Sequence, residues 1–266
     1  MSGPSLPGVP EGPPPSHEGG ARLLDPLKVM HRLRSPGGCP WDAEQTHQSL
    51  ARHLLEEAHE TLEAIDRGDT VALREELGDL LLQVVFHAEM AMQEGRWDID
   101  DVAETITAKL IRRHPHVFGD VRVGSAAEVL VNWERIKTEE KGEHPLEHDI
   151  APSLPALARA AKVQRRAAGV RFDWRSREGS MAKVREELDE LAAADPDEAE
   201  GELGDVLFAL AALGRQVGVD PETALRKATR RFSERFERMR AEAVAEGRDL
   251  AALSEDELLA RFRRAR

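Results

Sequence analysis

Apolar residues recur at helical spacing along most of the chain from about residue 22 onward. One segment places them at i, i+3, i+4, i+7, i+8 and i+11, which is the spacing of one helix face: Leu77, Leu80, Leu81, Val84, Val85 and Ala88. A later segment repeats this pattern with Leu203, Val206, Leu207, Leu210 and Ala211. The pattern predicts an all-α protein in which packed helices bury these stripes.

Local residues predict several helix ends. A helix before the first stripe is expected to stop near Gly68, because glycine readily adopts the left-handed conformation that ends helices. Asp195-Pro196-Asp197-Glu198 predicts an N-cap with a first-turn proline, and Asp220-Pro221 predicts another helix start. Two further pairs have capping-box spacing: Ser125 with Glu128, and Ser254 with Glu257.

The acidic residues around the stripes show that the chain contains an internal repeat. Glu56-Glu57-Ala58-His59-Glu60 precedes Glu76-Leu77-Gly78-Asp79, and Glu186-Glu187-Leu188-Asp189-Glu190 precedes Glu202-Leu203-Gly204-Asp205. The repeat predicts two tandem helical-bundle domains, residues 21–136 and 153–266. A charged, proline-bearing linker is expected over residues 137–152 and a disordered Pro/Gly tail over residues 1–20.

Composition narrows the expected partners and compartment. The formal net charge of −13 argues against stable nucleic-acid binding, which needs a basic surface. No apolar run approaches the roughly 18 residues needed to span a membrane, and the first 20 residues lack the features of a secretory signal. The single cysteine, Cys39, excludes an intramolecular disulfide framework, so we expect a cytoplasmic protein.

The repeated acids are candidate metal ligands. Residues i and i+3 lie on one helix face, and two carboxylates about 5 Å apart repel by roughly 3 kcal/mol at an effective dielectric of 20. Carboxylate oxygens without thiolates suit Mg²⁺, with Mn²⁺ as a second option. The candidate ligands are Glu57, Glu60, Glu76 and Asp79 in the first half, and Glu187, Glu190, Glu202 and Asp205 in the second.

Two other interpretations of the acids remain open. They could be the solvated faces of ordinary charged helices. Glu56-x-x-His59 also matches half of a di-iron carboxylate motif, although the second half has Asp189 in place of the histidine.

A basic pattern follows each acidic pair and is a candidate phosphate-binding element. Lys109 and Arg113 in the first half, and Arg231 and Arg235 in the second, are spaced i, i+4 on a predicted helix face. Arginine suits phosphate because its planar fork donates two parallel hydrogen bonds. The alternative is that these cations form salt bridges along a highly charged helix.

The acidic motifs on consecutive helices resemble those of the MazG family of all-α nucleoside triphosphate pyrophosphohydrolases. Other similar stretches are Gly38-Cys39-Pro40-Trp41-Asp42, Glu44-Gln45-Thr46-His47, His114-Pro115-His116-Val117-Phe118-Gly119-Asp120, Asn132-Trp133-Glu134 and Phe172-Asp173-Trp174. The two-domain arrangement is similar to full-length members of the family. The resemblance implies Mg²⁺-dependent hydrolysis of nucleoside triphosphates to monophosphate and diphosphate, with broad base tolerance, in a homodimer that maintains the nucleotide pool.

The resemblance also assigns residue roles. It identifies the four second-half acids named above as metal ligands, with the four first-half acids as their equivalents. It assigns Lys183, Arg231 and Arg235 to the substrate phosphates, with Lys109 and Arg113 as first-half equivalents. Both halves therefore remain candidate active sites.

Two further roles are hypotheses about mechanism. Glu56 and Glu186, each one residue before a ligand pair, are candidates to orient or deprotonate the attacking water. Trp41 is a candidate to stack on a nucleotide base. A non-catalytic helical dimer that senses nucleotides is the alternative to an enzyme.

Overall fold

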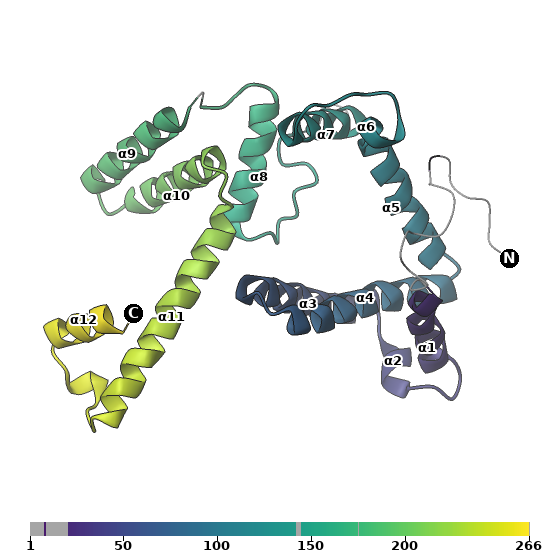
Figure 1. Ribbon diagram of the computed structural model, residues 1–266, viewed down its shortest axis with the longest axis horizontal. Helices are drawn as coiled ribbons and strands as arrows, with labels where there is room; N and C mark the ends of the chain where they lie inside the picture. Colours follow the sequence, from purple (N-terminus) through teal and green to yellow (C-terminus); the bar gives the residue numbers. More distant parts are fainter. Residues whose placement is uncertain (1–7, 9–20, 142–144, 175, 266) are drawn as a thin grey trace. The chain divides into compact units, whose positions relative to one another are not determined.

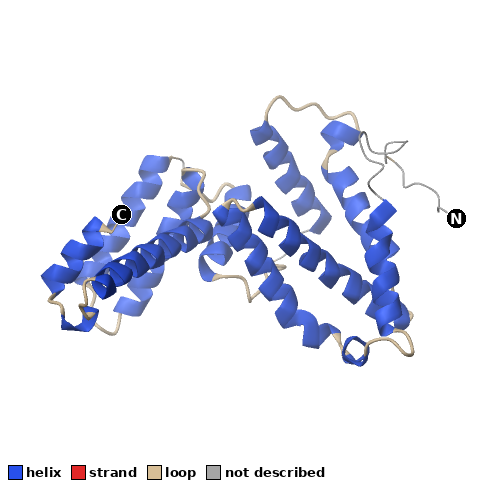
Figure 2. Ribbon diagram, turned by 60° about the horizontal axis from the view of Figure 1, so that its bottom comes forward, coloured by secondary structure: helices blue, strands red, loops and turns tan. Residues whose placement is uncertain are grey.

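The computed structural model describes Gly8 and residues 21–141, 145–174 and 176–265. These residues form twelve α-helices, two short 3-10 helices and no strand (Figures 1 and 2). The expected all-α class is confirmed. The expected Pro/Gly tail lies outside the described residues, apart from Gly8. None of the described helices is long and apolar enough to cross a membrane.

The chain divides into two compact units, Met1–Lys137 and Thr138–Arg266. The division falls inside helix α7, Ala126–Lys141. Residues 137–141 of the expected linker are therefore helical, because α7 continues past the boundary, and residues 142–144 lie outside the described part of the chain.

The first unit is organised around α3 and α4, which pack along each other as a helical hairpin (Figure 1). Its elements before α7 are η1 Ala21–Leu24, α1 Asp25–Arg34, α2 Pro40–Glu44, α3 His47–Arg67, α4 Thr70–Gln93, α5 Ile99–Arg113 and α6 Pro115–Phe118. Helix α1 covers the second half of α4, and α5 leaves α4 toward α6.

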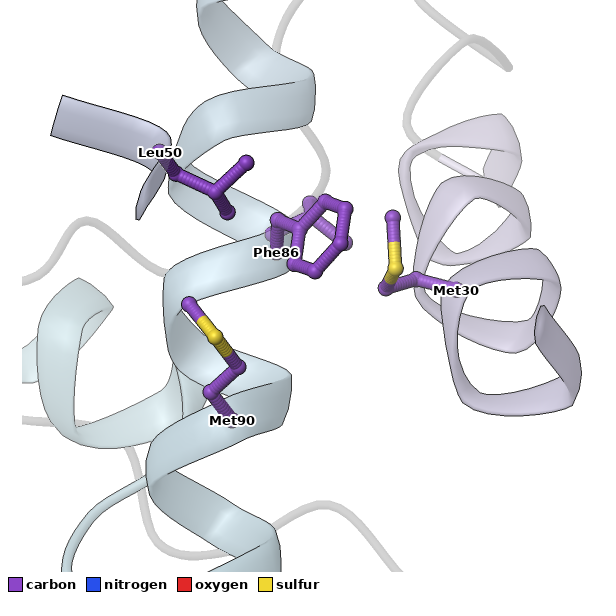
Figure 3. Packing of buried hydrophobic residues seen from close by; sticks show 5 residues of the cluster. Met30, Leu50, Phe86 and Met90 are labelled. Atoms are coloured by element: carbon purple, nitrogen blue, oxygen red, sulfur yellow. The ribbon is translucent and has the colours of Figure 1, made fainter. Parts of the chain in front are cut away.

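The core of the first unit joins α1, α3 and α4. Met30, Leu50, Val85, Phe86 and Met90 form one cluster in which no residue is more than 3% exposed. The Phe86 ring lies between Leu50 and Met30 (Figure 3). Burial of such a side chain stabilises the fold by about 1.5–3 kcal/mol, so this cluster fixes α1 on one end of the hairpin.

The turn between α3 and α4 forms as the sequence predicts. Gly68 has φ of 68°, and its N–H and that of Asp69 donate to the carbonyls of Ile65 and Ala64. The Asp69 side chain then accepts from the N–H groups of Val71 and Ala72 and caps α4. The expected stop at Gly68 is confirmed.

The second unit contains a matching hairpin of α9 and α10. Its elements are α8 Ala156–Gly169, α9 Arg177–Ala193, α10 Ala199–Gln216, α11 Pro221–Ala245, η2 Leu250–Ala252 and α12 Glu255–Arg264. Helix α8 packs on α10, and α12 packs against the long helix α11. Val184, Val206, Ala209 and Ala211 are buried in this unit, so small side chains allow the helices to approach closely.

Three of the expected helix starts occur in the structure. The Asp220 side chain accepts from the N–H of Thr223 at the start of α11, and Ser254 with Glu257 forms a complete capping box. The Ser125 hydroxyl accepts from the N–H of Glu128, and the Glu128 carboxylate accepts from the N–H of Gly124.

The expected helix start at Asp195 is wrong, although the Glu198 carboxylate accepts from the Asp195 N–H at 3.4 Å as the capping-box spacing predicts. The Asp195 carbonyl accepts from the N–H groups of Glu198 and Ala199, so residues 195–198 form a turn and α10 begins at Ala199. The proline constrains this segment equally well in a turn as in a first helical turn.

Each hairpin buries only one side of its apolar pattern. On α4, Val85 and Ala88 are buried, whereas Leu77 is 51% exposed and Val84 is also exposed. The second hairpin exposes Leu188, Leu203, Leu207, Phe208 and Leu210. The expectation that each whole stripe is buried within its own bundle is therefore wrong for this chain alone, since two helices cover one another on one face only.

Candidate metal centres

The first carboxylate cluster lies on the facing sides of α3 and α4. Glu57, Glu76 and Asp79 each place a carboxylate oxygen within 4.8 Å of the others. Partial burial is the largest cause that raises the pKa of Glu57, followed by the charges of Asp79, Glu60 and Glu76. The pKa of Glu76 is raised by burial and then by Glu60 and Asp79. Glu60 stands outside the three-residue group but adds to its negative field.

The second cluster occupies the corresponding place on α9 and α10. Glu187, Glu190 and Glu202 have carboxylate oxygens within 4.8 Å of one another, and Glu187 is buried. Burial raises the pKa of Glu190, and its hydrogen bond and charge interaction with Glu187 add to the shift. Asp205, the fourth expected ligand, is exposed on α10 and is not part of this group.

A nitrogen-bearing side chain lies beside each cluster. Lys183 Nζ contacts Glu186 at 2.5 Å and Glu187 at 2.8 Å, and these two carboxylates raise the pKa of the lysine. In the first unit, His53 Nδ1 lies 3.0 Å from the Glu56 carboxylate. Each of the candidate bases Glu56 and Glu186 is thus paired with a side chain from the preceding helical turn.

His53 is a site residue that the sequence interpretation missed. It stands four residues before Glu57, as Lys183 stands four residues before Glu187, so the repeat register contained the signal. Trp41 is 53% exposed, and its ring centroid lies 6.4 Å from that of His53. The structure therefore brings Trp41 next to His53, the histidine that pairs with the candidate base Glu56.

His59 does not join the carboxylates. Among the described residues, the groups able to hold a metal ion contain only glutamate and aspartate. The histidine that suggested a di-iron site is exposed on α3, and that alternative has no support in the geometry.

The expected phosphate-binding cations of the second unit differ in their surroundings. Arg231 is exposed on α11. Arg235 donates through Nε to the Phe262 carbonyl, and its guanidinium lies 4.2 Å from the centroid of the Phe262 ring. Helix α12 therefore holds Arg235 in place.

Lys109 and Arg113 lie on α5 and have different roles in the structure. Arg113 is 8% exposed and lies over the Trp133 ring at 5.4 Å, so packing accounts for its position. Lys109 is exposed and lines a cavity with Arg96 and Trp97. Neither residue belongs to the first carboxylate group.

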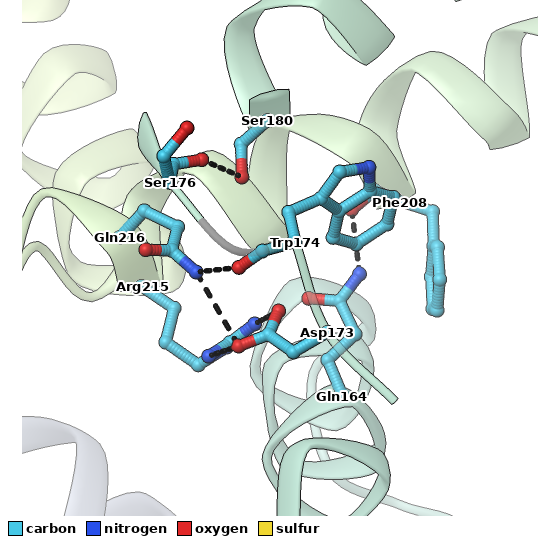
Figure 4. Close-up of polar contacts among 8 residues, drawn as sticks. All are labelled: Gln164, Asp173, Trp174, Ser176, Ser180, Phe208, Arg215 and Gln216. Carbon is cyan, nitrogen blue, oxygen red and sulfur yellow. Dashed lines mark hydrogen bonds and ion pairs between the residues drawn. The ribbon is translucent and has the colours of Figure 1, made fainter. Parts of the chain in front are cut away.

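A polar clamp fixes the segment before α9 to the end of α10 (Figure 4). Both carboxylate oxygens of Asp173 accept from Arg215, and Gln216 donates to Asp173 at 3.3 Å and to the Trp174 carbonyl at 3.0 Å. The hydrogen bonds from Arg215 are the main cause that lowers the pKa of Asp173. The clamp fixes the segment from which α9 starts and therefore the position of Glu187 on that helix.

Comparison with known families matches each half of the chain separately. The model of the MazG nucleotide pyrophosphohydrolase domain matches residues 45–118. The model of phosphoribosyl-ATP pyrophosphohydrolase matches residues 163–232. Each match contains one hairpin and its carboxylate cluster.

Curated relatives extend the similarity to both units. The nucleoside triphosphate pyrophosphohydrolase/pyrophosphatase MazG of Thermotoga maritima is 49% identical over 225 residues, which cover 84% of this chain and 87% of the relative. A nucleoside triphosphate pyrophosphohydrolase of Escherichia coli K12 is 47% identical over 237 residues, covering 85% of this chain and 90% of the relative. The chain belongs to the MazG nucleotide pyrophosphohydrolase family.

Proposed function

We propose that this protein hydrolyses nucleoside triphosphates to the monophosphate and diphosphate, with Mg²⁺ as cofactor, broad base tolerance and a role in clearing the nucleotide pool. The observation that carries the proposal is the pair of carboxylate clusters with raised pKa values on the repeated hairpins. The names of the relatives from Thermotoga maritima and Escherichia coli support the same reaction.

The donor set fits a hard divalent cation. Three carboxylate oxygens within 4.8 Å repel one another, and a divalent cation relieves this repulsion while matching their preference for oxygen coordination. The groups that would hold Mg²⁺, or Mn²⁺ in its place, are the two clusters, with Glu60 and Asp205 as further ligands on the same helices. A bound divalent cation neutralises phosphate charge and makes a coordinated water more acidic.

The side chains of the chain supply the remaining steps. Glu56 or Glu186 accepts the proton of the attacking water, whose oxygen forms a bond to the α-phosphorus. The bond from that phosphorus to the bridging oxygen breaks, and diphosphate leaves with the electron pair. Lys183 and Arg231 stabilise the negative charge on the phosphates. Arg235, oriented by Phe262, donates through the rest of its guanidinium.

The exposed hairpin faces support a homodimer. Leu203, Leu207 and Leu210 lie at helical spacing on α10 and remain at least 42% exposed, and Leu77 and Val84 of α4 are 51% and 41% exposed. Contiguous apolar surface of this kind marks an interaction site on a water-exposed protein. Two copies that join these faces would complete a four-helix bundle around each cluster.

A product assay tests the reaction. The protein is incubated with each nucleoside triphosphate and Mg²⁺, and the phosphorus-containing products are resolved by ³¹P NMR. Monophosphate and diphosphate are expected in equal amounts. Release of inorganic phosphate with nucleoside diphosphate, or tight binding without turnover, would overturn the proposal, and the second result would favour a nucleotide sensor.

Matched variants locate the active unit. Glu57→Gln and Glu187→Gln each remove one ligand charge with little change of shape. Glu63→Gln is the control, because Glu63 is exposed near the C-terminal end of α3, where it pairs with the exposed Arg67. A loss of turnover of about 100-fold or more in one ligand variant identifies the catalytic cluster.

A further inference from the structure

The first unit contains a cavity of about 540 Å³ at the start of α5. It is lined by Arg96, Trp97, Asp101, Val102, Ile106 and Lys109, among others. No residue of either carboxylate cluster lines it. The lining combines two cations, the Asp101 carboxylate, an indole ring and an apolar strip of α5. Lys109 alone among these residues has a role assigned above, as a candidate phosphate contact.

Trp97 lies beside a coplanar pair of imidazole rings. The ring centroids of His47 and His87 are 4.9 Å apart with an interplanar angle of 3°, and their Nδ1 atoms are 2.6 Å apart, so the two rings meet edge to edge in one plane. The Trp97 ring centroid lies 6.3 Å from that of His47, with an interplanar angle of 26°. Trp97 is 36% exposed and lines the cavity, so part of its ring is open to a planar ligand.

Hydrogen bonds hold the two imidazoles in a defined state. Arg96 Nη2 lies 2.7 Å from His47 Nε2, and because arginine can only donate, this nitrogen is the acceptor. The proton of His47 is consequently on Nδ1, which lies 2.6 Å from Nδ1 of His87 and donates to it. These hydrogen bonds fix the side chains beside Trp97 before any ligand arrives.

The cationic side of the cavity lies along α5. Val102, Ile106 and Lys109 follow one another at i, i+4 and i+7, so they share a helix face that rises by about 10 Å. Lys109 makes no hydrogen bond or ion pair with the described residues, and its ammonium is available to an anion. Arg96 adds a second cation, although the Glu94 carboxylate also contacts it.

The cavity is set apart from the carboxylates along the hairpin. His47 precedes Glu57 by ten residues on α3, and His87 follows Asp79 by eight residues on α4. At 1.5 Å per residue, these separations correspond to about 15 Å and 12 Å along the helix axes. A small ligand on Trp97 does not reach the first carboxylate cluster of the same chain.

We propose that this cavity is a separate, metal-independent site for a nucleoside phosphate. The base stacks on the exposed part of Trp97, beside the His47–His87 pair, the sugar lies along Val102 and Ile106, and the phosphate binds Lys109 and Arg96. Stacking on an aromatic ring accepts any base, while the two cations require an anionic group. The site binds nucleotide without hydrolysing it, because it holds no carboxylate cluster.

Calorimetric titration with AMP in excess EDTA tests this site, since AMP has no phosphoanhydride bond and EDTA removes metal-mediated binding. Wild-type protein is expected to bind AMP at one site per chain and adenosine at least about tenfold more weakly. Trp97→Leu and Lys109→Gln should each weaken AMP binding by about tenfold or more, whereas Trp97→Phe keeps the stack and stays within about threefold.

Two controls separate this site from the carboxylate clusters. The double variant Glu57→Gln/Glu187→Gln should bind AMP like the wild type in EDTA, whether or not it hydrolyses triphosphates. Arg67→Gln removes an exposed charge of α3 and should also leave AMP binding unchanged. Circular dichroism confirms that each variant is folded.

Three results would overturn the proposal. They are no AMP binding at millimolar concentration, wild-type affinity in both folded Trp97→Leu and Lys109→Gln, or loss of binding in the carboxylate double variant. These results are distinct from a failure of the hydrolysis proposal, because that proposal is tested by the products formed in the presence of Mg²⁺.

Discussion

At the residue scale, the neighbouring carboxylates of each cluster repel one another, and a bound cation would reduce this repulsion. Glu57 is partly buried beside three other acids, and all of these surroundings raise its pKa. In metal-free protein, such a group opposes folding when it is ionised. Its contribution is most favourable below the unfolded-state pKa of about 4.3 and is lost as pH rises through the higher folded-state pKa.

Glu57→Gln should therefore raise the melting temperature of the metal-free protein at neutral pH. We expect an increase of about 1–3 °C, since the side chain is partly solvated and its charge is partly screened. Mg²⁺ should stabilise the wild type by more than the variant, because a ligand charge is missing. Thermal melts with EDTA and with Mg²⁺ measure both effects. A variant that melts lower than the wild type in EDTA would contradict this account.

Asp173 makes the opposite kind of contribution. Arg215 lowers its pKa, and both side chains are only 21% exposed. Asp173→Asn should destabilise the second unit by about 1–3 kcal/mol, because the guanidinium loses its charged partner. Urea denaturation measures the loss, with Asp25→Asn as the control, since Asp25 pairs with Lys28 at an exposed position and should change stability by less than about 0.5 kcal/mol.

The pH dependence of the same pair gives a second check. A lowered folded-state pKa means that the stabilisation by Asp173 is present above the unfolded-state value of about 3.9 and disappears as pH falls through the folded-state pKa. The difference between wild type and Asp173→Asn should therefore shrink in acid. An equal difference at pH 7 and at the acid limit would show that charge is not the cause.

The sequence predicted which acids face each other but not how many converge. Helical spacing alone placed Glu187 with Glu190 and Glu202 with Asp205. Which members meet depends on the rotation and stagger of α9 against α10, and buried contacts such as Val184 and Val206 set these. The acids do not control that packing, so the separation of Asp205 from the cluster could not be read from their spacing.

At the scale of the element, helix ends were predictable where a single local interaction decides them. Gly68 adopts a positive φ that other residues adopt only with strain, and Asp220 and Ser254 satisfy free N–H groups of the first helical turn. The helix start near Asp195 could not be predicted from local sequence, because a turn satisfies the N–H groups of Glu198 and Ala199 as well as a helix would. Local sequence leaves those two outcomes nearly equal.

Gly78 and Gly204 stand inside the acidic helices without a local reason. A methyl group at either position would meet no atom within 4 Å. Glycine in a helix interior costs about 0.5–1 kcal/mol relative to alanine, so Gly78→Ala should stabilise the first unit by that amount. Gly68→Ala should instead destabilise it by about 1–2 kcal/mol, because its φ is 68°.

Urea denaturation of both glycine variants separates the two effects. The pair is matched, since each adds one methyl group into open space and only the backbone conformation differs. Destabilisation by Gly78→Ala would show that another copy of the chain or a ligand approaches this side of α4.

At the scale of the whole molecule, the repeat explains why two hairpins look alike while their surroundings differ. The register preserves the acids, but His53 replaces the lysine seen at Lys183, and Arg113 packs on Trp133 where Arg235 is held by Phe262. The sequence showed the duplication directly. It could not show which face of each hairpin is covered within the chain. A covered apolar face and an apolar face without a partner consist of the same residue types, so periodicity does not distinguish them.

The exposed side of the second hairpin gives the prediction that belongs to this scale. Leu207 is 42% exposed in the middle of α10, and burying such a side chain in a dimer contributes about 1.5–3 kcal/mol per copy. Leu207→Lys loses this contribution in both copies and places two cations in the interface. We expect the dimer dissociation constant to rise by at least about 100-fold.

Sedimentation equilibrium over a range of concentrations measures this change. Val244→Lys is the matched control, because Val244 is 69% exposed on α11, outside the hairpin faces, and should leave the dimer intact. A wild-type protein that remains monomeric at micromolar concentration would refute the homodimer. If Leu207→Lys dissociates the dimer and also abolishes hydrolysis while the helix content is unchanged, the second copy contributes to the active site, since each hairpin alone leaves one side of its carboxylate cluster without a packed neighbour.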